Sequence, residues 1–93
     1  MELLRSRYFL RVLTLDRPGV MASIATVLGD RGISLASVVQ KESVTLGDDQ
    51  PGAEIVLTTH AASEAAIQDA LETLRRMPVV NTVGNVLRVE DFT

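Results

Sequence analysis

The tetrapeptide Asp16-Arg17-Pro18-Gly19 separates a strand pattern from a helical pattern in the first third of the chain. Residues 8–15 before it partly alternate, with Tyr8, Leu10 and Val12 on one face and Phe9, Arg11 and Leu13 on the other. Such alternation is typical of a half-buried strand. After the tetrapeptide, apolar residues recur at helical spacing at Val20, Ile24, Val27 and Leu28. The turn therefore predicts a strand that leads directly into a helix.

Three residues mark where this first helix is expected to begin and end. Pro18 suits the first helical turn, because its missing N–H costs nothing there. Asp16 can offer its carboxylate to the unpaired N–H groups of the same turn. Gly32 is a suitable left-handed stop. We therefore expect a helix capped by Asp16 and closed by Gly32.

Two further strand patterns follow, at residues 33–42 and 53–59, and a turn cluster at residues 47–52 separates them. No helical pattern lies between them, so they are expected to form an antiparallel hairpin. Glu54 is expected to oppose Lys41 across this hairpin.

The last third of the chain predicts a second helix and a closing strand. Ser63 is a favourable N-cap, and Met77-Pro78 ends the helical pattern that follows it. Residues 79–89 form a strand pattern, and Gly84-Asn85 within it predicts a bulge or a bend. Between these limits the helix has an apolar stripe of Ile67, Ala70, Leu71 and Leu74.

The predicted order βαββαβ is the split βαβ arrangement of ferredoxin-like α+β domains. Right-handed crossovers place both helices on one face of a four-stranded antiparallel sheet. The other face then carries Phe9, Arg11 and Leu13, a mixed set for an uncovered surface. We therefore expect this face to pair with a second copy or with a host domain.

The composition excludes several classes of function. A chain of 93 residues forms one domain, and its net charge of −3 and scattered basic residues argue against a nucleic-acid partner. The chain has no cysteine and one histidine, so a thiolate or typical zinc site is not expected. No apolar run reaches the length of a membrane span, and the first residues lack a signal peptide's apolar core. We expect a cytoplasmic protein without a membrane partner.

The turn at Asp16–Gly19 is also the first candidate for a binding site. Backbone N–H groups at a helix start attract a carboxylate, and Gly19 lets a ligand approach the backbone closely. Asp16 could meet an ammonium group, so a zwitterionic amino acid fits both needs. The alternative is that Asp16 only caps the helix and Pro18-Gly19 only shapes the turn. Because such caps are common, the residues by themselves favour this alternative.

Several segments of the chain resemble the ACT domain, a small βαββαβ regulatory module of enzymes of amino-acid metabolism. The general resemblance lies in residues 8–12, 16–21 and 32–35. Residues 33–42, 53–60, 78–80 and 86–90 are similar to the C-terminal ACT domain of bacterial homoserine dehydrogenase, and Ser-Val-Val-Gln-Lys-Glu at 37–42 is the more specific signal. The resemblance covers residues 8–90, which leaves residues 1–7 as a disordered segment or linker and residues 91–93 as a tail.

The resemblance implies a small amino-acid effector, threonine as the pathway's feedback inhibitor, and a homodimer or larger assembly formed through the sheet. It also implies that the catalytic domain of the same polypeptide binds NAD(P) and interconverts aspartate semialdehyde and homoserine, whereas this domain carries no cofactor, metal or catalytic residue. Ser34 stands where many amino-acid-binding ACT domains carry Asn. The effector-binding positions that the resemblance implies are Thr14, Asp16, Gly19, Val20 and Met21, with Ser34 supplied by a neighbouring chain.

Two other functions compete with this interpretation. Some ACT domains bind no known ligand and serve only in protein–protein association. A ferredoxin-like enzyme or a single-strand nucleic-acid binder is the third class, but the sequence shows no nucleophile–base constellation and no Gly-x-Gly-x-x-Gly. Aromatic residues are only 3% of the chain, too few for a sheet face that stacks bases.

Overall fold

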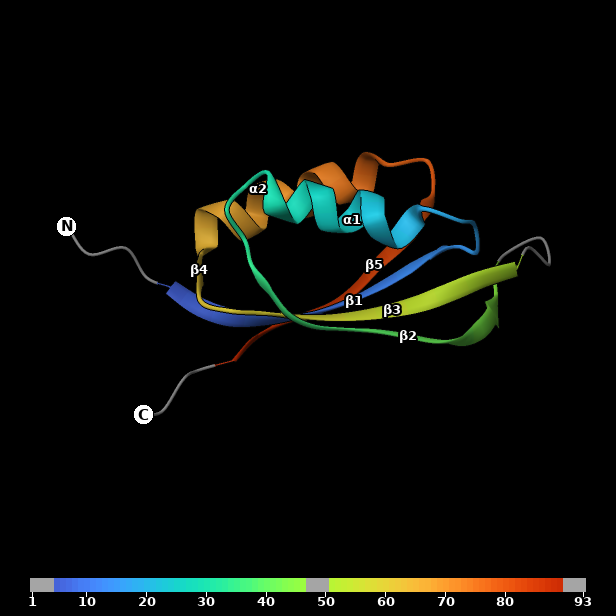
Figure 1. Cartoon of the computed structure of the whole chain (residues 1–93), viewed down its shortest axis with the longest axis horizontal. Coiled ribbons are helices and arrows are strands. Elements are labelled where there is room, and N and C mark those ends of the chain that lie inside the picture. Colours follow the sequence, from blue (N-terminus) through green and yellow to red (C-terminus); the bar gives the residue numbers. More distant parts are fainter. Residues whose placement is uncertain (1–4, 47–50, 90–93) are drawn as a thin grey trace.

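The computed structural model describes residues 5–46 and 51–89, which form an antiparallel sheet with two helices on one face (Figure 1). The predicted ferredoxin-like α+β arrangement is confirmed. The elements in chain order are β1 (Arg5–Leu15), α1 (Val20–Gly29), β2 (Leu35–Thr45), β3 (Pro51–Thr59), β4 (Ala62–Ser63), α2 (Glu64–Arg76) and β5 (Val80–Val89).

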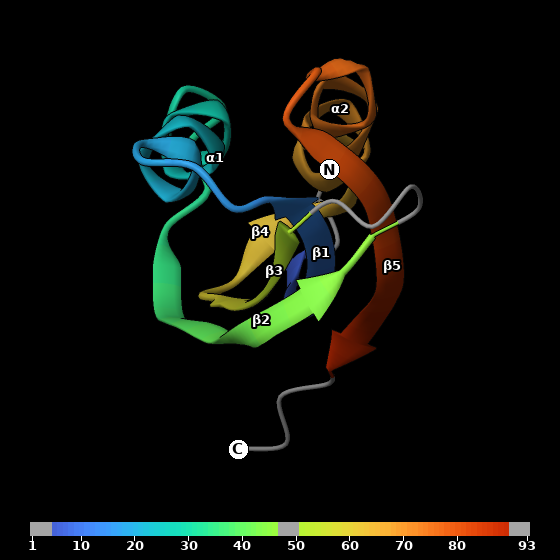
Figure 2. The same ribbon diagram turned by 90° about the vertical axis from the view of Figure 1, so that its right-hand side faces the viewer.

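β1 lies in the middle of the sheet, with β3 and β5 paired antiparallel to it. β2 pairs antiparallel with β3, so the predicted hairpin is confirmed. Figure 2 shows α1 and α2 side by side above the sheet, with β2 and β5 at its two sides. The four predicted strands are all present, and the two-residue β4 is an addition that pairs with Arg5 and Ser6 of β1.

Three strands extend beyond a predicted end, because pairing with a neighbouring strand adds residues that the local pattern did not include. β1 begins at Arg5, inside the segment 1–7 that was expected to be disordered or a linker. β2 runs over Leu35–Thr45 rather than 33–42, and β3 begins at Pro51 rather than at residue 53. Residues 1–4, 47–50 and 90–93, which include most of the predicted turn cluster and the tail, lie outside the described residues.

The core lies between the sheet and the helices, and the predicted alternation of β1 is confirmed. Tyr8, Leu10 and Val12 are buried under the helices, whereas Phe9 and Leu13 on the other face are only half-buried. Each large aliphatic side chain buried in this way stabilises the fold by roughly 1.5–3 kcal/mol. The helices and β3 contribute Val20, Ile24, Leu28, Ile67, Leu71, Leu74, Ile55 and Leu57 to the same core.

The two helix ends predicted from glycine and serine are confirmed. Gly32 adopts φ 75°, and the N–H groups of Gly32 and Ile33 donate to the carbonyls of Gly29 and Leu28, each at 3.0 Å. This is a Schellman closure of α1. Ser63 is the N-cap of α2, where its Oγ accepts from the N–H of Ala66 at 3.1 Å.

Asp16 does not cap α1, so that prediction is wrong. The N-cap residue is Gly19, with φ 83°, and no side chain caps the helix. Because the helix begins only at Val20, Pro18 precedes the first helical turn instead of lying in it. Asp16 stands three residues before the N-cap, and its side chain is exposed.

The predicted contact between Glu54 and Lys41 is replaced by another ion pair. Glu54 accepts from Nε of Arg11 on β1, across the open face of the sheet. The pairing of β2 with β3 is interrupted between Gln40 and Ser43, so Glu54 has no regular partner on β2. The predicted irregularity at Gly84 is present in β5, where the register against β1 shifts between Leu10 and Val12.

Candidate functional site

A cavity of about 340 Å³ lies beside the turn that joins β1 to α1. Figure 1 shows this turn at the end of the domain opposite the start of β1 and the end of β5. Elements far apart in the sequence form the walls, because β2 and β3 run under the start of α1. The lining residues are Thr14, Leu15, Asp16, Arg17, Pro18, Gly19, Val20, Met21, Gln40, Ala53 and Ile55.

The first turn of α1 contributes Val20 and Met21 to the lining of this cavity. The first N–H groups of a helix have no acceptor within it, and no side chain caps α1. The first turn also contains no acidic residue, so no carboxylate of the helix itself offsets the positive end of its dipole. A Cβ built on Gly19 would meet nothing within 4 Å, so the backbone is open to approach. The turn can therefore accept a carboxylate.

Two backbone hydrogen bonds hold the turn in place. The N–H of Leu15 donates to the carbonyl of Val79 at 2.8 Å, and the N–H of Asp16 donates to the carbonyl of Pro51 at 3.4 Å. The Asp16 side chain is exposed at the rim, where Leu15, Asp16, Arg17 and Pro51 also border a shallower hollow of about 200 Å³. A carboxylate in this position can meet a ligand's ammonium group at the mouth of the cavity.

Thr14 lies on the inner wall of the cavity and is completely buried. Among the described residues, its Oγ1 is the buried side-chain polar atom without a hydrogen-bond partner. A buried hydroxyl left unpaired costs about 1–3 kcal/mol, and native proteins seldom leave such groups without a reason. The cavity thus combines backbone donors, an exposed carboxylate and an unpaired internal hydroxyl.

Ser34 is not part of this cavity within one chain. Its carbonyl accepts from the N–H of His60 at 2.9 Å, and the neighbouring Leu35 pairs with Thr59. Thr14 pairs with Ala53 on β3. Ala53 precedes Thr59 by six residues, which corresponds to about 20 Å along the strand. The fold therefore brings together Thr14, Asp16, Gly19, Val20 and Met21, and places Ser34 at the other end of the sheet.

Gln40, Ala53 and Ile55 line the cavity although the sequence analysis did not select them as site residues. Gln40 pairs with Ile55 and so lies on the side of β2 that faces the helices, two residues after the half-buried Val38. A polar residue in an otherwise apolar row was the available signal. The sequence does not give the register of β2 against β3, so this signal could not place Gln40 beside the turn.

The described part of the chain offers little else for chemistry. Within residues 5–46 and 51–89, no group of three or more His, Asp or Glu side chains could hold a metal ion. No helix in these segments has the length and apolar character needed to cross a bilayer.

Comparison with known families gives a match of residues 8–79 to the ACT domain. The chain belongs to the ACT domain family. As an ACT domain it is similar to the homoserine dehydrogenase of Methylobacillus glycogenes, with 36% identity over 88 residues, which are 95% of this chain and 21% of that protein. The homoserine dehydrogenase of Pseudomonas aeruginosa is 38% identical over 89 residues, which are 95% of this chain and 19% of that protein.

Solved structures also include proteins that are similar to this ACT domain. A homoserine dehydrogenase from Thiobacillus denitrificans superposes with a TM-score of 0.80 and 32% identity, over 97% of this chain and 19% of that chain. The ligand-free regulatory subunit of aspartate kinase from Thermus thermophilus shares the fold, with a TM-score of 0.54, 20% identity, and coverage of 97% of this chain and 53% of that one. The domain spans about a fifth of the length of the homoserine dehydrogenases that it matches.

Proposed function

We propose that this ACT domain is the regulatory part of a homoserine dehydrogenase and that it binds an amino-acid effector, threonine, beside Asp16–Gly19. The similarity to homoserine dehydrogenases over nearly the whole chain supports the choice of parent enzyme. In such an enzyme the catalytic domain of the same cytoplasmic polypeptide interconverts aspartate semialdehyde and homoserine with NAD(P). The residues of this chain do not fit that cofactor, because the β1–α1 turn lacks the Gly-x-Gly-x-x-Gly pattern.

The observation that carries the proposal is the composition of the cavity at the β1–α1 turn. Its volume lies in the range of small-molecule sites. The uncapped start of α1 suits a carboxylate, Asp16 suits an ammonium group, and Val20, Ala53 and Ile55 provide an apolar wall. These are the groups that a free amino acid with a small side chain needs. Ser34 of a second chain would complete the site, so we expect binding to require a dimer.

A second candidate function, association without a ligand, rests on the open face of the sheet. We define the open face by the outward side chains Phe9, Arg11, Leu13, Val39, Val56, Leu87 and Val89. Val39, Leu87 and Val89 are 51%, 55% and 42% exposed. Exposed apolar side chains on several strands of one face favour a protein partner. Dimerisation through the sheet is common to both candidate functions.

Calorimetric titration and thermal shift with threonine, isoleucine, serine and methionine separate the two functions. We expect threonine to bind and to raise the melting temperature, because a ligand that binds only the folded state stabilises it. Asp16→Ala should weaken this binding by at least about tenfold, the loss expected for a charged hydrogen bond. Asp30→Ala is the matched control, because Asp30 is an exposed aspartate at the other end of α1.

Absence of heat and of a thermal shift with all four amino acids would reject the effector and leave association as the function. Equal binding by Asp16→Ala and Asp30→Ala would reject the role of Asp16 in the site.

A further inference from the structure

Among the described residues of the sheet, Thr14 and Thr59 are completely buried, and Thr59 alone of these two has a hydrogen-bond partner. Thr59 Oγ1 accepts from the backbone N–H of Tyr8 at 3.0 Å, next to the interruption between β3 and β4. Thr14 Oγ1 has no partner within the described part of the chain. The fold thus provides a partner for the hydroxyl of Thr59 and leaves the hydroxyl of Thr14, which lines the cavity, unpaired.

The surroundings of Thr14 explain why the sheet does not supply a partner. On the helix-facing side of β1 it continues the row of Leu10 and Val12, which are completely buried. Its neighbours across the sheet are Ala53 on β3 and Val80 on β5, and neither side chain can form a hydrogen bond. A valine would have nearly the same shape without the cost of an unpaired hydroxyl. The hydroxyl therefore has no partner in the sheet, and it belongs to a residue that lines the cavity.

The polarity of the cavity orients an amino acid inside it. The donors at the start of α1 and the carboxylate of Asp16 are at the exposed mouth, and they would hold the α-carboxylate and α-ammonium groups. The ligand's side chain then points inward, towards Thr14, Ala53 and Ile55. A hydroxyl on the ligand's β-carbon would meet Thr14 Oγ1, and a methyl group would meet the apolar wall.

We infer that Thr14 selects the effector by pairing its buried hydroxyl with a hydroxyl on the side chain of a small α-amino acid. This inference rests on the proposed function, because it requires an amino acid in the cavity. It adds that the site distinguishes ligands of nearly equal shape by whether their side chains can form a hydrogen bond with Thr14. A site built to bond a ligand hydroxyl rejects the analogue that lacks it, because the protein's own polar group is then left unpaired.

Titration with L-threonine, L-serine, L-valine and L-2-aminobutyrate tests the inference on the whole 93-residue chain. We expect the wild type to bind threonine at least about tenfold more tightly than valine, which is the cost of leaving the site's hydroxyl unpaired. Thr14→Val should bring the ratio of the threonine affinity to the valine affinity close to one, and it should raise the melting temperature of the ligand-free protein. Thr14→Ser should retain the preference, because it keeps the hydroxyl.

The outcomes distinguish the inference from the function on which it rests. Equal binding of threonine and valine by the wild type would overturn the selection by hydroxyl and leave amino-acid binding intact. A Thr14→Val protein that keeps the wild-type ratio would overturn the role of Thr14. Binding of none of the four ligands would reject the proposed function and the inference together. Thermal unfolding of each variant checks that a lost preference for threonine over valine is not caused by a loss of folding.

Discussion

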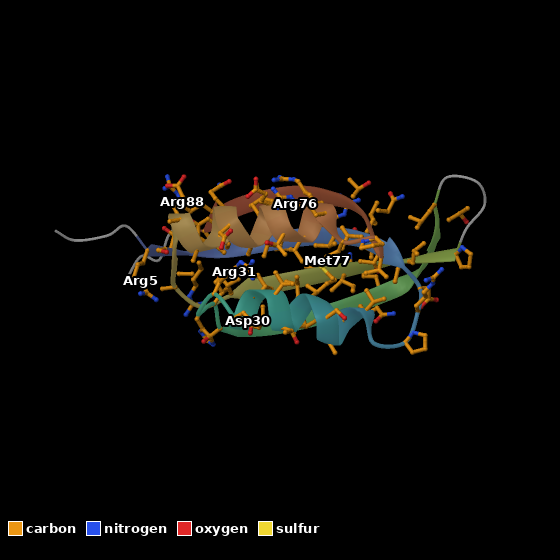
Figure 3. All side chains as sticks on the ribbon, turned by 90° about the horizontal axis from the view of Figure 1, so that it is seen from above. Arg5, Asp30, Arg31, Arg76, Met77 and Arg88 are labelled. Carbon is orange, nitrogen blue, oxygen red and sulfur yellow. The ribbon has the colours of Figure 1, made fainter. Side chains whose placement is uncertain are left out.

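The guanidinium group of Arg31 joins the end of α1 to α2, with Nε 3.0 Å from Oδ2 of Asp69. The same group donates from Nη2 to Oγ1 of Thr73 at 2.7 Å and from Nη1 to the carbonyl of Val27 at 2.9 Å. In Figure 3, Arg31 lies between the two helices. The Arg31 side chain is 24% exposed, and its bonds to Val27 and Thr73 are partly buried, whereas the Asp69 side chain is 61% exposed. Arg31 therefore fixes the helix pair at the end opposite the cavity.

Arg31→Ala should lower the free energy of unfolding by about 1.5–3 kcal/mol, the range for hydrogen bonds to a charged group. Arg31→Lys should retain only part of this free energy of unfolding, because an ammonium group lacks the planar guanidinium geometry that reaches three acceptors. Arg76→Ala is the control, since its pair with Glu72 is well exposed and should contribute less than about 0.5 kcal/mol. Urea unfolding measures all three. Equal losses for Arg31→Ala and Arg76→Ala would show that Arg31 does not join the helices.

Ser63→Ala should destabilise the domain by about 1 kcal/mol, because the N–H of Ala66 loses its acceptor at the start of α2. Ser23→Ala is a matched control. The exposed Ser23 hydroxyl donates back to the carbonyl of Gly19 within α1, an interaction that adds little to helix stability. Thermal unfolding should therefore separate the two variants, and a loss in Ser23→Ala as large as that in Ser63→Ala would contradict the capping role.

Gly32→Ala and Gly29→Ala should change stability in opposite directions. A Cβ at either position would meet nothing within 4 Å, so the two variants differ only in backbone conformation. Gly32 has φ 75°, where a side chain costs about 1–2 kcal/mol. Gly29 lies in α1, where alanine should add about 0.4–1 kcal/mol by restricting the unfolded chain. Denaturant midpoints that shift in the same direction would contradict this.

Leu87→Lys combined with Val39→Lys should convert the dimer that we propose into a monomer in analytical ultracentrifugation. Both side chains are exposed on the open face, at 55% and 51%, so the free energy of unfolding of the monomer should change by less than about 0.5 kcal/mol. Ala65→Lys, on the exposed side of α2, should leave the dimer intact. A dimer that survives the double substitution would place the interface elsewhere, for example at the free edge of β2.

Local patterns were sufficient for the two helices, for the four long strands and for the buried sides of these elements, but not for the two-residue β4. The alternation at Tyr8–Leu13 predicted the two faces of β1, and Ser63 and Gly32 predicted helix ends, because caps and periodicity depend on residues near in sequence. Asp16 failed as a cap because Gly19 takes a left-handed conformation and starts the helix later. Glu54 binds Arg11 because the pairing of β1 with β3 makes the two residues diagonal neighbours, and this register has no local signature in the sequence.

The sequence by itself determined the order of the elements, the buried face of the sheet and the turn at which a ligand could meet a helix start. These properties depend on the conformational preferences and spacing of consecutive residues. The tertiary structure decided that Gln40, Ala53 and Ile55 enclose that turn, that Thr14 Oγ1 lacks a partner, and that Ser34 lies at the opposite end of the sheet. These depend on which strands pair and in what register, since pairing brings together residues that are distant along the chain.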